Sequence, residues 1–374
     1  MKYYNTDEIR EVDAHYNFVI GERSNGKTTA VLRDIVKEWY ETGKKGAIVR
    51  QMEEDIKGHK GASLFSGLNA GGMIPELTDG EYHHVKFYNR AYYMVSLDED
   101  GMEKTNKEPF AHIFAVSQAV HYKSNSYPNV GTIFFDEFMR ADQLYLKDEV
   151  VQFLNLVSTI VREKDEAKIF LVANTISWNS PYFIKFGLRD VAKMKPGELA
   201  TFGGGKNGRD MKVAVEYCES TAEYGGKASD IYFQFDDERV AMITDGSFAI
   251  PKYPQCPISW KIRDVKCTYW FGTDHGRIRG RLIKVADQVF VFCEKVDDVT
   301  YEAVKDDRRD LFYSAEFRGE WNHHVQPTRR TRDTRTGYLA DAIGSSRMFF
   351  TDNETGEDLM YFVKQMLDRS IVSI

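Results

Sequence analysis

The sequence predicts an α/β protein whose core is a mainly parallel sheet, followed by a second, smaller α+β domain. Two observations predict the core: short apolar runs of strand length end in polar or acidic residues, and stretches with helical spacing of apolar side chains separate them. A glycine-rich break near residue 205 and a new series of strand signals after residue 250 predict the second domain. We therefore divide the 374-residue chain into 1–205, a small lid or linker at 206–250, and 251–374.

The composition is that of an ordinary globular protein, with 42% hydrophobic and 29% charged residues. No apolar run approaches the roughly 20 residues of a membrane span, and the N-terminus is polar, so we expect neither a membrane protein nor a secreted one. The four cysteines are widely spaced, which argues against structural zinc and a disulfide framework. The net charge of −7 excludes a uniformly basic surface but permits a local basic stripe.

The first strand signal leads into a glycine-bounded loop, in the stretch NFVIGERSNGKTT (17–29). Gly21, four further residues, Gly26, Lys27 and Thr28 fit the P-loop (Walker A) pattern GxxxxGK[ST]. Apolar residues recur at helical spacing after the loop, so it lies between a strand and a helix. In such a loop, backbone N–H groups and the lysine bind phosphates, and the threonine hydroxyl is a ligand of Mg²⁺. The predicted ATP contacts here are Gly21, Glu22, Arg23, Ser24, Asn25, Gly26, Lys27, Thr28 and Thr29.

An acidic pair ends the next clear strand signal, VGTIFFDEFMR. An acid at the carboxyl end of a buried strand beside a phosphate loop can complete a magnesium site, and that residue is Asp136. The adjacent Glu137 is placed to polarise an attacking water, which a hydrolase needs and a kinase does not. A third strand signal ends in Asn174, which either contacts the γ-phosphate or occupies a simple strand-to-loop turn. Arg162 ends a helical stretch, and from the residues alone it is an ordinary surface arginine.

Further strand signals fill the segment between the phosphate loop and the acidic pair. Residues 45–50 indicate a strand after the first helix, and residues 91–97 and 112–117 indicate a pair joined across the turn DEDG. An extra strand at this place is expected of the additional-strand (ASCE) ATPases that use a catalytic glutamate, and not of simple nucleotide kinases. The pattern therefore favours a motor or a remodelling ATPase.

Beyond these generic motifs, the chain resembles the terminase-like DNA-packaging ATPases (encapsidation proteins) of phi29-like bacteriophages. NFVIGERSNGKTTA is similar to that family's phosphate loop, and KSNSYPNVGTIFFDEFMR is similar along its whole length to the segment around its acidic motif. LNLVSTIVRE and FLVANTISWNSPYF also have counterparts in the same order. The SNxYPN run before DEF is not a generic ATPase feature and is the most discriminating match. The likeness extends from about Asn17 to Phe183 and is faint after Gly203.

The resemblance implies a motor that uses ATP and Mg²⁺ to pump double-stranded DNA into a procapsid. It implies a homomeric ring, pentameric in that family, docked on the portal of the procapsid in the host bacterial cytoplasm. In some relatives a structural packaging RNA lies between motor and portal, so such an RNA is a candidate partner.

The family's functional residues map onto positions already singled out. Lys27 and Thr28 match its phosphate and magnesium contacts. Asp136 matches its metal-binding acid, and Glu137 matches its catalytic glutamate. Arg162 falls on the arginine finger that acts in trans on a neighbouring subunit, a contact worth ~10³–10⁵ in rate.

The DNA contacts are less clearly matched. Arg23, which is counted above among the ATP contacts, falls on an arginine that packaging motors often carry within the loop. Where the family has consecutive basic residues after the second strand, this chain has RQMEE (50–54), so Lys57 and Lys60 in the following loop are our candidate DNA contacts. A basic segment follows Arg318, and it is either a DNA contact or a solvated loop. Its residues that we expect on DNA are Arg329, Arg330 and Arg332.

The second domain begins with three strand signals separated by turns and ends in an amphipathic helix at 359–367. An RNase H-like nuclease domain begins with such a β-meander, and large terminases carry one behind their ATPase. Asp274 and Asp341 can in principle hold two metal ions, although Asp274 also reads as a turn residue. Because the phi29-like motors resemble this fold but have lost the nuclease, we expect a vestigial nuclease domain that binds DNA or the portal.

Three functions remain open on these grounds. The leading one is a DNA-translocating ATPase that packages a viral genome. The second is a large terminase with an active metal-dependent nuclease, whose cleavage Asp274→Ala would abolish. The third is a nucleotide-gated DNA-binding switch that does not translocate, and Glu137 beside Asp136 argues against it because a switch gains nothing from a dedicated water activator.

Overall fold

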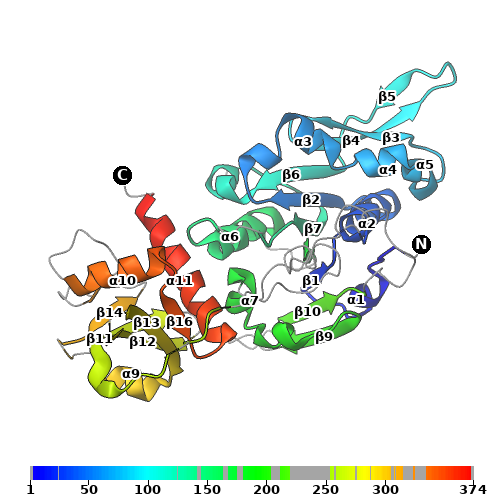
Figure 1. Ribbon diagram of the computed structural model, residues 1–374. Helices are drawn as coiled ribbons and strands as arrows, with labels where there is room; N and C mark the ends of the chain where they lie inside the picture. The colour runs from blue at the N-terminus through cyan, green and yellow to red at the C-terminus, as the bar shows by residue number, and fades with distance from the viewer. Residues whose placement is uncertain are drawn as a thin grey trace, which may run out of the picture. The chain divides into compact units, whose positions relative to one another are not determined.

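The computed structural model divides the chain into two compact units, Met1–Ala249 and Ile250–Ile374, each with its own sheet (Figure 1). The described residues are 3–23, 25–123, 125–140, 145–162, 167–174, 180–203, 211–219, 253–256, 258–273, 276–286, 288–304, 307, 309–314, 323–324 and 334–371. None of the helices in these ranges combines the length and the apolar character that a membrane crossing requires.

Ten strands of the described residues form the sheet of the first unit, in the order β3-β4-β6-β2-β7-β8-β1-β10-β9 with β5 paired to β4. The central strands from β6 to β10 are parallel, whereas β3, β4, β5 and β9 are antiparallel additions at the two edges. The strands are β1 (Tyr16–Gly21), β2 (Lys45–Arg50), β3 (His84–Tyr88), β4 (Ala91–Leu97), β5 (Glu103–Thr105), β6 (Ala111–Ala115), β7 (Val130–Asp136), β8 (Lys168–Asn174), β9 (Glu198–Gly203) and β10 (Lys212–Tyr217).

The central strands are continuous apolar runs because helices cover both faces of the sheet (Figure 1). Successive side chains of one strand therefore enter two different cores: Phe135 packs with the core that includes α6 and α7, and Phe134 with the core that includes α2. The helices are α1 (Asp7–Glu11), α2 (Lys27–Thr42), α3 (Gly58–Ser63), α4 (Ser66–Ala70), α5 (Met73–Leu77), α6 (Glu149–Val161) and α7 (Pro181–Phe186), with 3₁₀ turns η1 (Glu53–Asp55), η2 (Val116–Tyr122) and η3 (Arg189–Lys193).

Local sequence explains where the longest of these helices begins and ends. Gly26, just before α2, has φ +94°, and Gly43, just after it, has φ +72°, both in the left-handed region that glycine adopts at little cost. At α7, the Ser180 side chain accepts a hydrogen bond from the Tyr182 N–H, and Pro181 occupies the first helical position.

The sheet differs from our expectations in two places. The strands at 91–97 and 112–117 do pair, but only through two residue pairs, because the turn after Leu97 leads into the short polar strand β5, which has too few residues to give a sequence signal. The sheet also includes β10, which lies in the segment 206–250 that we assigned to a lid or linker and which pairs in parallel with β1. The expected linker at 206–250 otherwise lies largely outside the described residues.

The second unit contains a six-stranded sheet in the order β15-β14-β11-β12-β13-β16. The predicted β-meander is present as β11, β12 and β13, and β14 and β15 add in parallel beside β11, which is the RNase H-like arrangement. Its elements are β11 (Val265–Thr273), β12 (Gly276–Val285), β13 (Gln288–Val296), β14 (Leu311–Ser314), β15 (His323–His324), β16 (Met348–Phe350), η6 (Ile262–Asp264), α9 (Asp298–Val304), α10 (Thr334–Gly344) and α11 (Asn353–Ile371). The predicted C-terminal helix is α11, and its apolar stripe enters the core of this unit.

The face of this sheet that packs on α10 and α11 carries aromatic side chains at its centre. Tyr269 and Phe271 of β11 lie there with Tyr313 of β14, and the Phe271 and Tyr313 rings stack with centroids 5.4 Å apart. Asp341 lies in α10, and Asp274 lies outside the described residues. Within the described residues, no three His, Cys, Asp or Glu side chains are grouped closely enough to hold a metal ion.

Candidate functional site

A pocket of about 420 Å³ opens in the first unit at the carboxyl ends of β1, β7 and β8. This edge of a parallel sheet is where ligands of α/β proteins bind. The pocket brings together the following predicted site residues: Asn25, Gly26, Lys27, Thr28, Thr29, Asp136, Glu137 and Asn174.

The phosphate loop has little room for side chains at its two glycines. A Cβ on Gly21 would lie 3.0 Å from the Cβ of Cys218, and a Cβ on Gly26 would lie 3.3 Å from the side chain of Tyr3. Gly26 also has the left-handed backbone that glycine adopts at little cost, so glycine is the residue that fits at both ends of the loop. The spacing of the two glycines and the helix that follows them are those of a phosphate-binding loop.

Lys27 is buried, with 5% of its surface exposed, and its ammonium is held by oxygen acceptors. Its Nζ donates to the carbonyls of Gly21 (3.2 Å) and Glu22 (2.5 Å) and to the side-chain oxygen of Asn25 (3.0 Å). It also lies 3.4 Å from Oδ1 of Asn174. These acceptors are uncharged dipoles, so they fix the position of the ammonium without cancelling its charge, and they place Asn174 within reach of a phosphate that the lysine binds.

Asp136 is 5% exposed and meets two partners at the end of β7. Its Oδ1 accepts a hydrogen bond from the Thr28 hydroxyl at 2.9 Å, and its Oδ2 lies 2.5 Å from Nη1 of Arg50. Burial raises the pKa of Asp136, and the adjacent charge of Glu137 adds to this rise, whereas Arg50 and Thr28 oppose it. A hydroxyl and a carboxylate side by side are the oxygen ligands that Mg²⁺ prefers, so the donor set fits that ion.

Glu137 lies beside this pair with a more exposed side chain, 65% accessible. Its backbone has φ +58°, a conformation that costs energy outside glycine and that clusters at functional sites. Its Oε2 lies 3.2 Å from Nη2 of Arg50, so one guanidinium bridges both acids. Our sequence analysis missed Arg50, although a cation that ends a buried strand beside an acid-ending strand was a usable signal.

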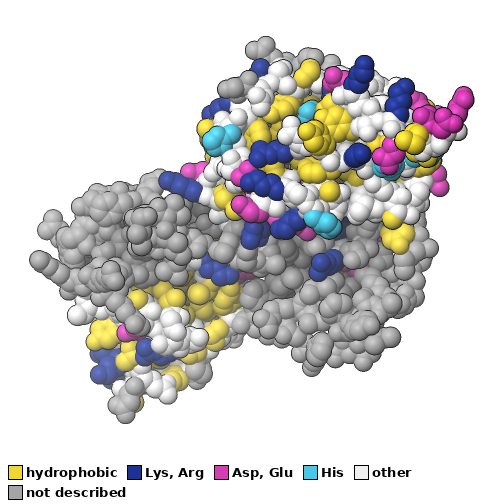
Figure 2. All heavy atoms as spheres, turned by 90° about the horizontal axis from the view of Figure 1, so that it is seen from above, with side chains coloured by type: hydrophobic (Ala, Val, Ile, Leu, Met, Phe, Trp, Pro, Cys, Tyr) yellow, Lys and Arg dark blue, Asp and Glu magenta, His cyan; other side chains and the backbone are white. Residues whose placement is uncertain are grey.

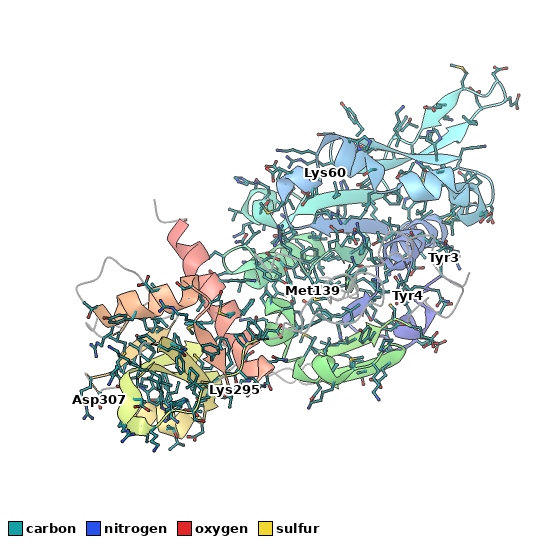
Figure 3. The ribbon with its side chains drawn as sticks, viewed as in Figure 1. Tyr3, Tyr4, Lys60, Met139, Lys295 and Asp307 are labelled. Carbon is teal, nitrogen blue, oxygen red and sulfur yellow. The ribbon has the colours of Figure 1, made fainter. Side chains whose placement is uncertain are left out.

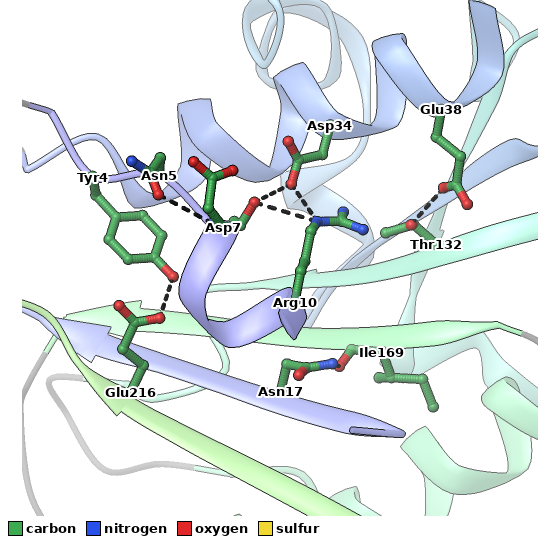
Figure 4. A network of polar contacts seen from close by, with 11 residues as sticks. Tyr4, Asn5, Asp7, Arg10, Asn17, Asp34, Glu38, Thr132, Ile169 and Glu216 are labelled. Atoms are coloured by element: carbon green, nitrogen blue, oxygen red, sulfur yellow. Dashed lines mark hydrogen bonds and ion pairs between the residues drawn. The ribbon is translucent and has the colours of Figure 1, made fainter. Parts of the chain in front are cut away.

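An N-terminal segment also contributes to the pocket and was missed as well. Tyr3 and Tyr4 line the pocket, and both lie close to the start of α2 (Figure 3). The Tyr4 N–H donates to the Asn25 carbonyl at 3.0 Å, and the Tyr4 hydroxyl donates to Oε2 of Glu216 at 2.7 Å (Figure 4). Burial raises the pKa of Glu216 to about 7, the charge of Glu8 adds to this, and the Tyr4 hydrogen bond lowers it.

The same N-terminal segment is tied to α2. Asp34 of α2 accepts hydrogen bonds from the Thr6 hydroxyl and from Nε of Arg10, the latter at 2.7 Å (Figure 4). The Arg10 guanidinium also lies over the Phe170 ring, 4.8 Å from its centroid. These contacts hold Tyr3 and Tyr4 over the phosphate loop.

Arg162 is not part of this pocket. It follows α6 with φ +35°, and its Nη2 donates to the Lys123 carbonyl at 3.0 Å. Because α6 connects the parallel strands β7 and β8, it runs back across the sheet, and Arg162 lies toward the opposite edge from the pocket.

The remaining predicted residues either lie away from the pocket or fall outside the described part of the chain. Arg23 is exposed and does not line the pocket, and Ser24 lies outside the described residues. Lys57 forms an ion pair with Glu53 at 3.0 Å, and Lys60 forms one with Asp55 at 2.8 Å. Each of these lysines therefore has an acidic partner in the described structure, and Figure 2 shows basic and acidic side chains together on the face that it presents. The following basic residues lie outside the described part of the chain: Arg329, Arg330 and Arg332.

Comparisons with known proteins place these observations in a family. Residues 1–195 match the family model of the podovirus DNA encapsidation protein (Gp16). The DNA packaging proteins of Bacillus phages phi29 and PZA are 30% identical over 188 residues, which is 50% of this chain and 50% of theirs. The chain thus spans about half the length of these curated relatives in the alignment.

Two solved structures share the fold over almost the whole chain. The Phi-28 gp11 DNA packaging motor is similar with a TM-score of 0.57 and 14% identity, covering 97% of this chain and 98% of its own. The bacteriophage Phi-29 viral genome packaging motor assembly is similar with a TM-score of 0.56 and 18% identity, covering 97% of this chain and 99% of its own. The likeness of fold therefore includes the second unit.

Proposed function

Because the chain belongs to the podovirus DNA encapsidation protein (Gp16) family, we propose that it is an ATPase that drives double-stranded DNA into a viral procapsid. The observation that carries the proposal is the convergence of the phosphate loop with Asp136 and Glu137 in one pocket. The fold that the chain shares with two packaging motors supports the same conclusion.

In this proposal the triphosphate of ATP lies along the loop, where Lys27 contacts the β- and γ-phosphates. Thr28 and Asp136 would hold Mg²⁺, which neutralises charge on the phosphate oxygens. Glu137 orients the attacking water and accepts its proton. Arg50 lies 3.2 Å from one oxygen of the Glu137 carboxylate, and in this proposal that contact opens when Glu137 acts on a water.

The proposed assembly is a homomeric ring, a pentamer as the family resemblance implies, docked on the procapsid portal in the host cytoplasm. Arg162 is suited to act on a neighbour's nucleotide because it lies away from its own pocket. The second unit is proposed to be a vestigial nuclease domain that binds DNA or the portal. A structural packaging RNA between motor and portal is tested by adding ribonuclease to a packaging assay.

The test is steady-state ATP hydrolysis with and without long double-stranded DNA and procapsids, for wild type and Glu137→Gln at two salt concentrations. We expect DNA with procapsids to accelerate turnover several-fold, an effect that weakens with salt as phosphate contacts do. We expect Glu137→Gln to lower kcat by a factor on the order of 100 or more while nucleotide binding is retained. Hydrolysis that is indifferent to both DNA and procapsids would instead support the nucleotide-gated switch.

A further inference from the structure

A buried carboxylate of the first unit lies outside the nucleotide pocket and takes no part in the chemistry proposed above. Glu149 is the first residue of α6 and is only 2% exposed. Its Oε1 accepts a hydrogen bond from the Tyr182 hydroxyl at 2.8 Å, and its Oε2 accepts from the Leu146 N–H at 2.8 Å and from Nε2 of Gln51. Burial raises the pKa of Glu149, and these three hydrogen bonds oppose the rise. The start of a helix needs only one short capping side chain, so this arrangement exceeds what capping requires.

Gln51, a hydrogen-bond partner of Glu149, is the neighbour in sequence of the arginine that contacts the acids of the nucleotide site. Gln51 follows Arg50, whose guanidinium contacts both Asp136 and Glu137. The Gln51 side chain is fixed at both ends, because its Oε1 accepts a hydrogen bond from Nη1 of Arg140 at 2.6 Å while its Nε2 donates to Glu149. The segment after β7 and the end of β2 therefore both connect to the first turn of α6.

The other end of α6 carries the arginine that is proposed to reach a neighbouring subunit. The helix has 13 residues, so it spans roughly 20 Å at 1.5 Å per residue. A helix of this length moves as a rigid element, and a displacement of its first turn at Glu149 displaces Arg162 at its far end.

We propose that Glu149 is a positioning residue that couples the nucleotide state of one subunit to the arginine that it presents to the next. The proposal rests on the proposed function, because it requires ATP hydrolysis in a ring. When the contact between Arg50 and Glu137 opens, the end of β2 shifts, Gln51 transmits the shift to Glu149, and α6 transmits it to Arg162. The coupling element is α6, because its position depends both on the nucleotide pocket of its own subunit and on the contact of Arg162 with the next subunit.

A substitution at Tyr182 can remove its hydrogen bond to Glu149 while the packing of the ring is kept. Its ring is fully buried against Phe135, Phe138 and Phe153, with centroids 5.7, 5.4 and 6.0 Å away. Tyr182→Phe keeps these ring contacts and deletes only the hydroxyl that holds Oε1 of Glu149. Glu149→Gln is a second, isosteric variant that removes the charge. Gln152→Ala is the matched control, because Gln152 lies in the first turns of the same helix and its side chain donates to the carbonyl of the exposed Lys147 at 2.7 Å, not to Glu149.

The experiment measures ATP hydrolysis by procapsid-bound full-length chains in the presence of DNA, while increasing fractions of Glu137→Gln chains are mixed in. In a coupled ring one inactive subunit also slows its neighbours, so wild-type activity should fall more steeply than the inactive fraction rises. We expect Tyr182→Phe and Glu149→Gln, each mixed with the same variant carrying Glu137→Gln, to give a nearly linear decline. When no Glu137→Gln chains are mixed in, we also expect Tyr182→Phe and Glu149→Gln to lower kcat by roughly 2- to 30-fold. Their nucleotide Kd should stay within about twofold of wild type.

The control Gln152→Ala should retain the steep wild-type curve. If both network variants also retain the steep curve, the coupling role of Glu149 is overturned while the proposed function stands. If nucleotide Kd and the thermal midpoint deteriorate together and the curve stays steep, Glu149 is only structural. A wild-type chain that hydrolyses no ATP would overturn the proposed function itself, and the inference with it.

Discussion

At the scale of single residues, the candidate site depends on side chains that meet from distant parts of the sequence. The phosphate loop and the acidic pair are contiguous motifs; Asn25 to Thr29 line one pocket with Asp136 and Glu137, while the roles assigned to them stay predictions. Arg50 is different, because it lies 86 positions before Asp136 and meets it only when β2 and β7 pair. Tyr4 meets Glu216 across 212 positions. Such contacts follow from strand order, which motif reading does not supply.

Tyr3 provides the first prediction. Its side chain lines the pocket and is 61% exposed, so its ring is free to stack on the base of a bound nucleotide. Tyr3→Ala should raise the KM for ATP by roughly 3- to 10-fold with kcat little changed, because an aromatic contact of this kind is worth about 0.5–1.5 kcal/mol. The matched control is Tyr88→Ala, which removes a tyrosine that is 72% exposed on β3. Equal KM values for the two variants would contradict a role for Tyr3 in base binding.

Glu216 provides a prediction on stability and pH. The fold raises its pKa from 4.5 to about 7, so between these values the folded chain retains a proton that the unfolded chain has released. The free energy of unfolding therefore falls as pH rises through this window, by at most about 1.4 kcal/mol per pH unit, and is flat above it. Denaturant midpoints should show this decline in wild type relative to Glu216→Gln.

Tyr4→Phe extends the same test. The Tyr4 hydroxyl stabilises the ionised form of Glu216 and lowers its pKa, so its removal should shift the upper end of the window above pH 7. A pH profile identical in wild type and both variants would show that Glu216 titrates normally.

At the scale of elements, the residue that ends α6 has to adopt a left-handed backbone and is also proposed to contact a neighbour's nucleotide. Arg162 has φ +35° and its N–H bonds back to the Ser158 carbonyl, which is a position that glycine normally fills. An arginine at such a site is costly for the fold, so its presence is consistent with a role for the side chain. The helix itself was predictable from its apolar spacing, but the backbone conformation at its end was not, because it depends on how the chain leaves the helix.

Two substitutions of Arg162 separate the effect of its backbone conformation on stability from the effect of its guanidinium on activity. Arg162→Gly should be more stable than Arg162→Ala by about 1 kcal/mol, since glycine adopts this conformation without strain. Both should lose DNA-stimulated ATP hydrolysis to the same large extent, because neither carries a guanidinium. Thermal unfolding and steady-state hydrolysis together check this. If Arg162→Gly kept activity, the arginine would be a structural residue and not a finger.

At the scale of the whole molecule, the two units differ in how far the sequence anticipated them. The sequence predicted that the central strands of the first sheet are parallel, because strand signals alternate with helical ones. It predicted the antiparallel meander of the second sheet from strand signals separated only by short turns. The place of β10 beside β1 was not anticipated, because its residues follow a glycine-rich break that looks like a domain end. The short polar strands β5 and β15 were missed for lack of an apolar pattern.

The second unit supports a prediction about nuclease activity. Its described sheet centre carries Tyr269, Phe271 and Tyr313, and the described residues contain no metal-binding group of acids. Because the family resemblance implies a vestigial nuclease, we expect the chain to leave supercoiled and linear DNA intact in Mg²⁺ or Mn²⁺ over hours, as judged by gel electrophoresis. Cleavage that depends on the metal and is lost in Asp274→Ala would instead establish the terminase with an active nuclease.

The outer strands of the ten-stranded sheet affect how copies of this chain can meet. β3 ends the sheet on one side, and its His84 and Lys86 side chains lie 3.4 and 3.5 Å from Glu103 of β5. Charged side chains at an open strand discourage the backbone pairing between molecules that leads to aggregates. Subunits built this way are expected to associate through side-chain contacts and not by extending one sheet into the next. In the proposed ring, a subunit could then change its position without breaking backbone hydrogen bonds between its β3 strand and a neighbour.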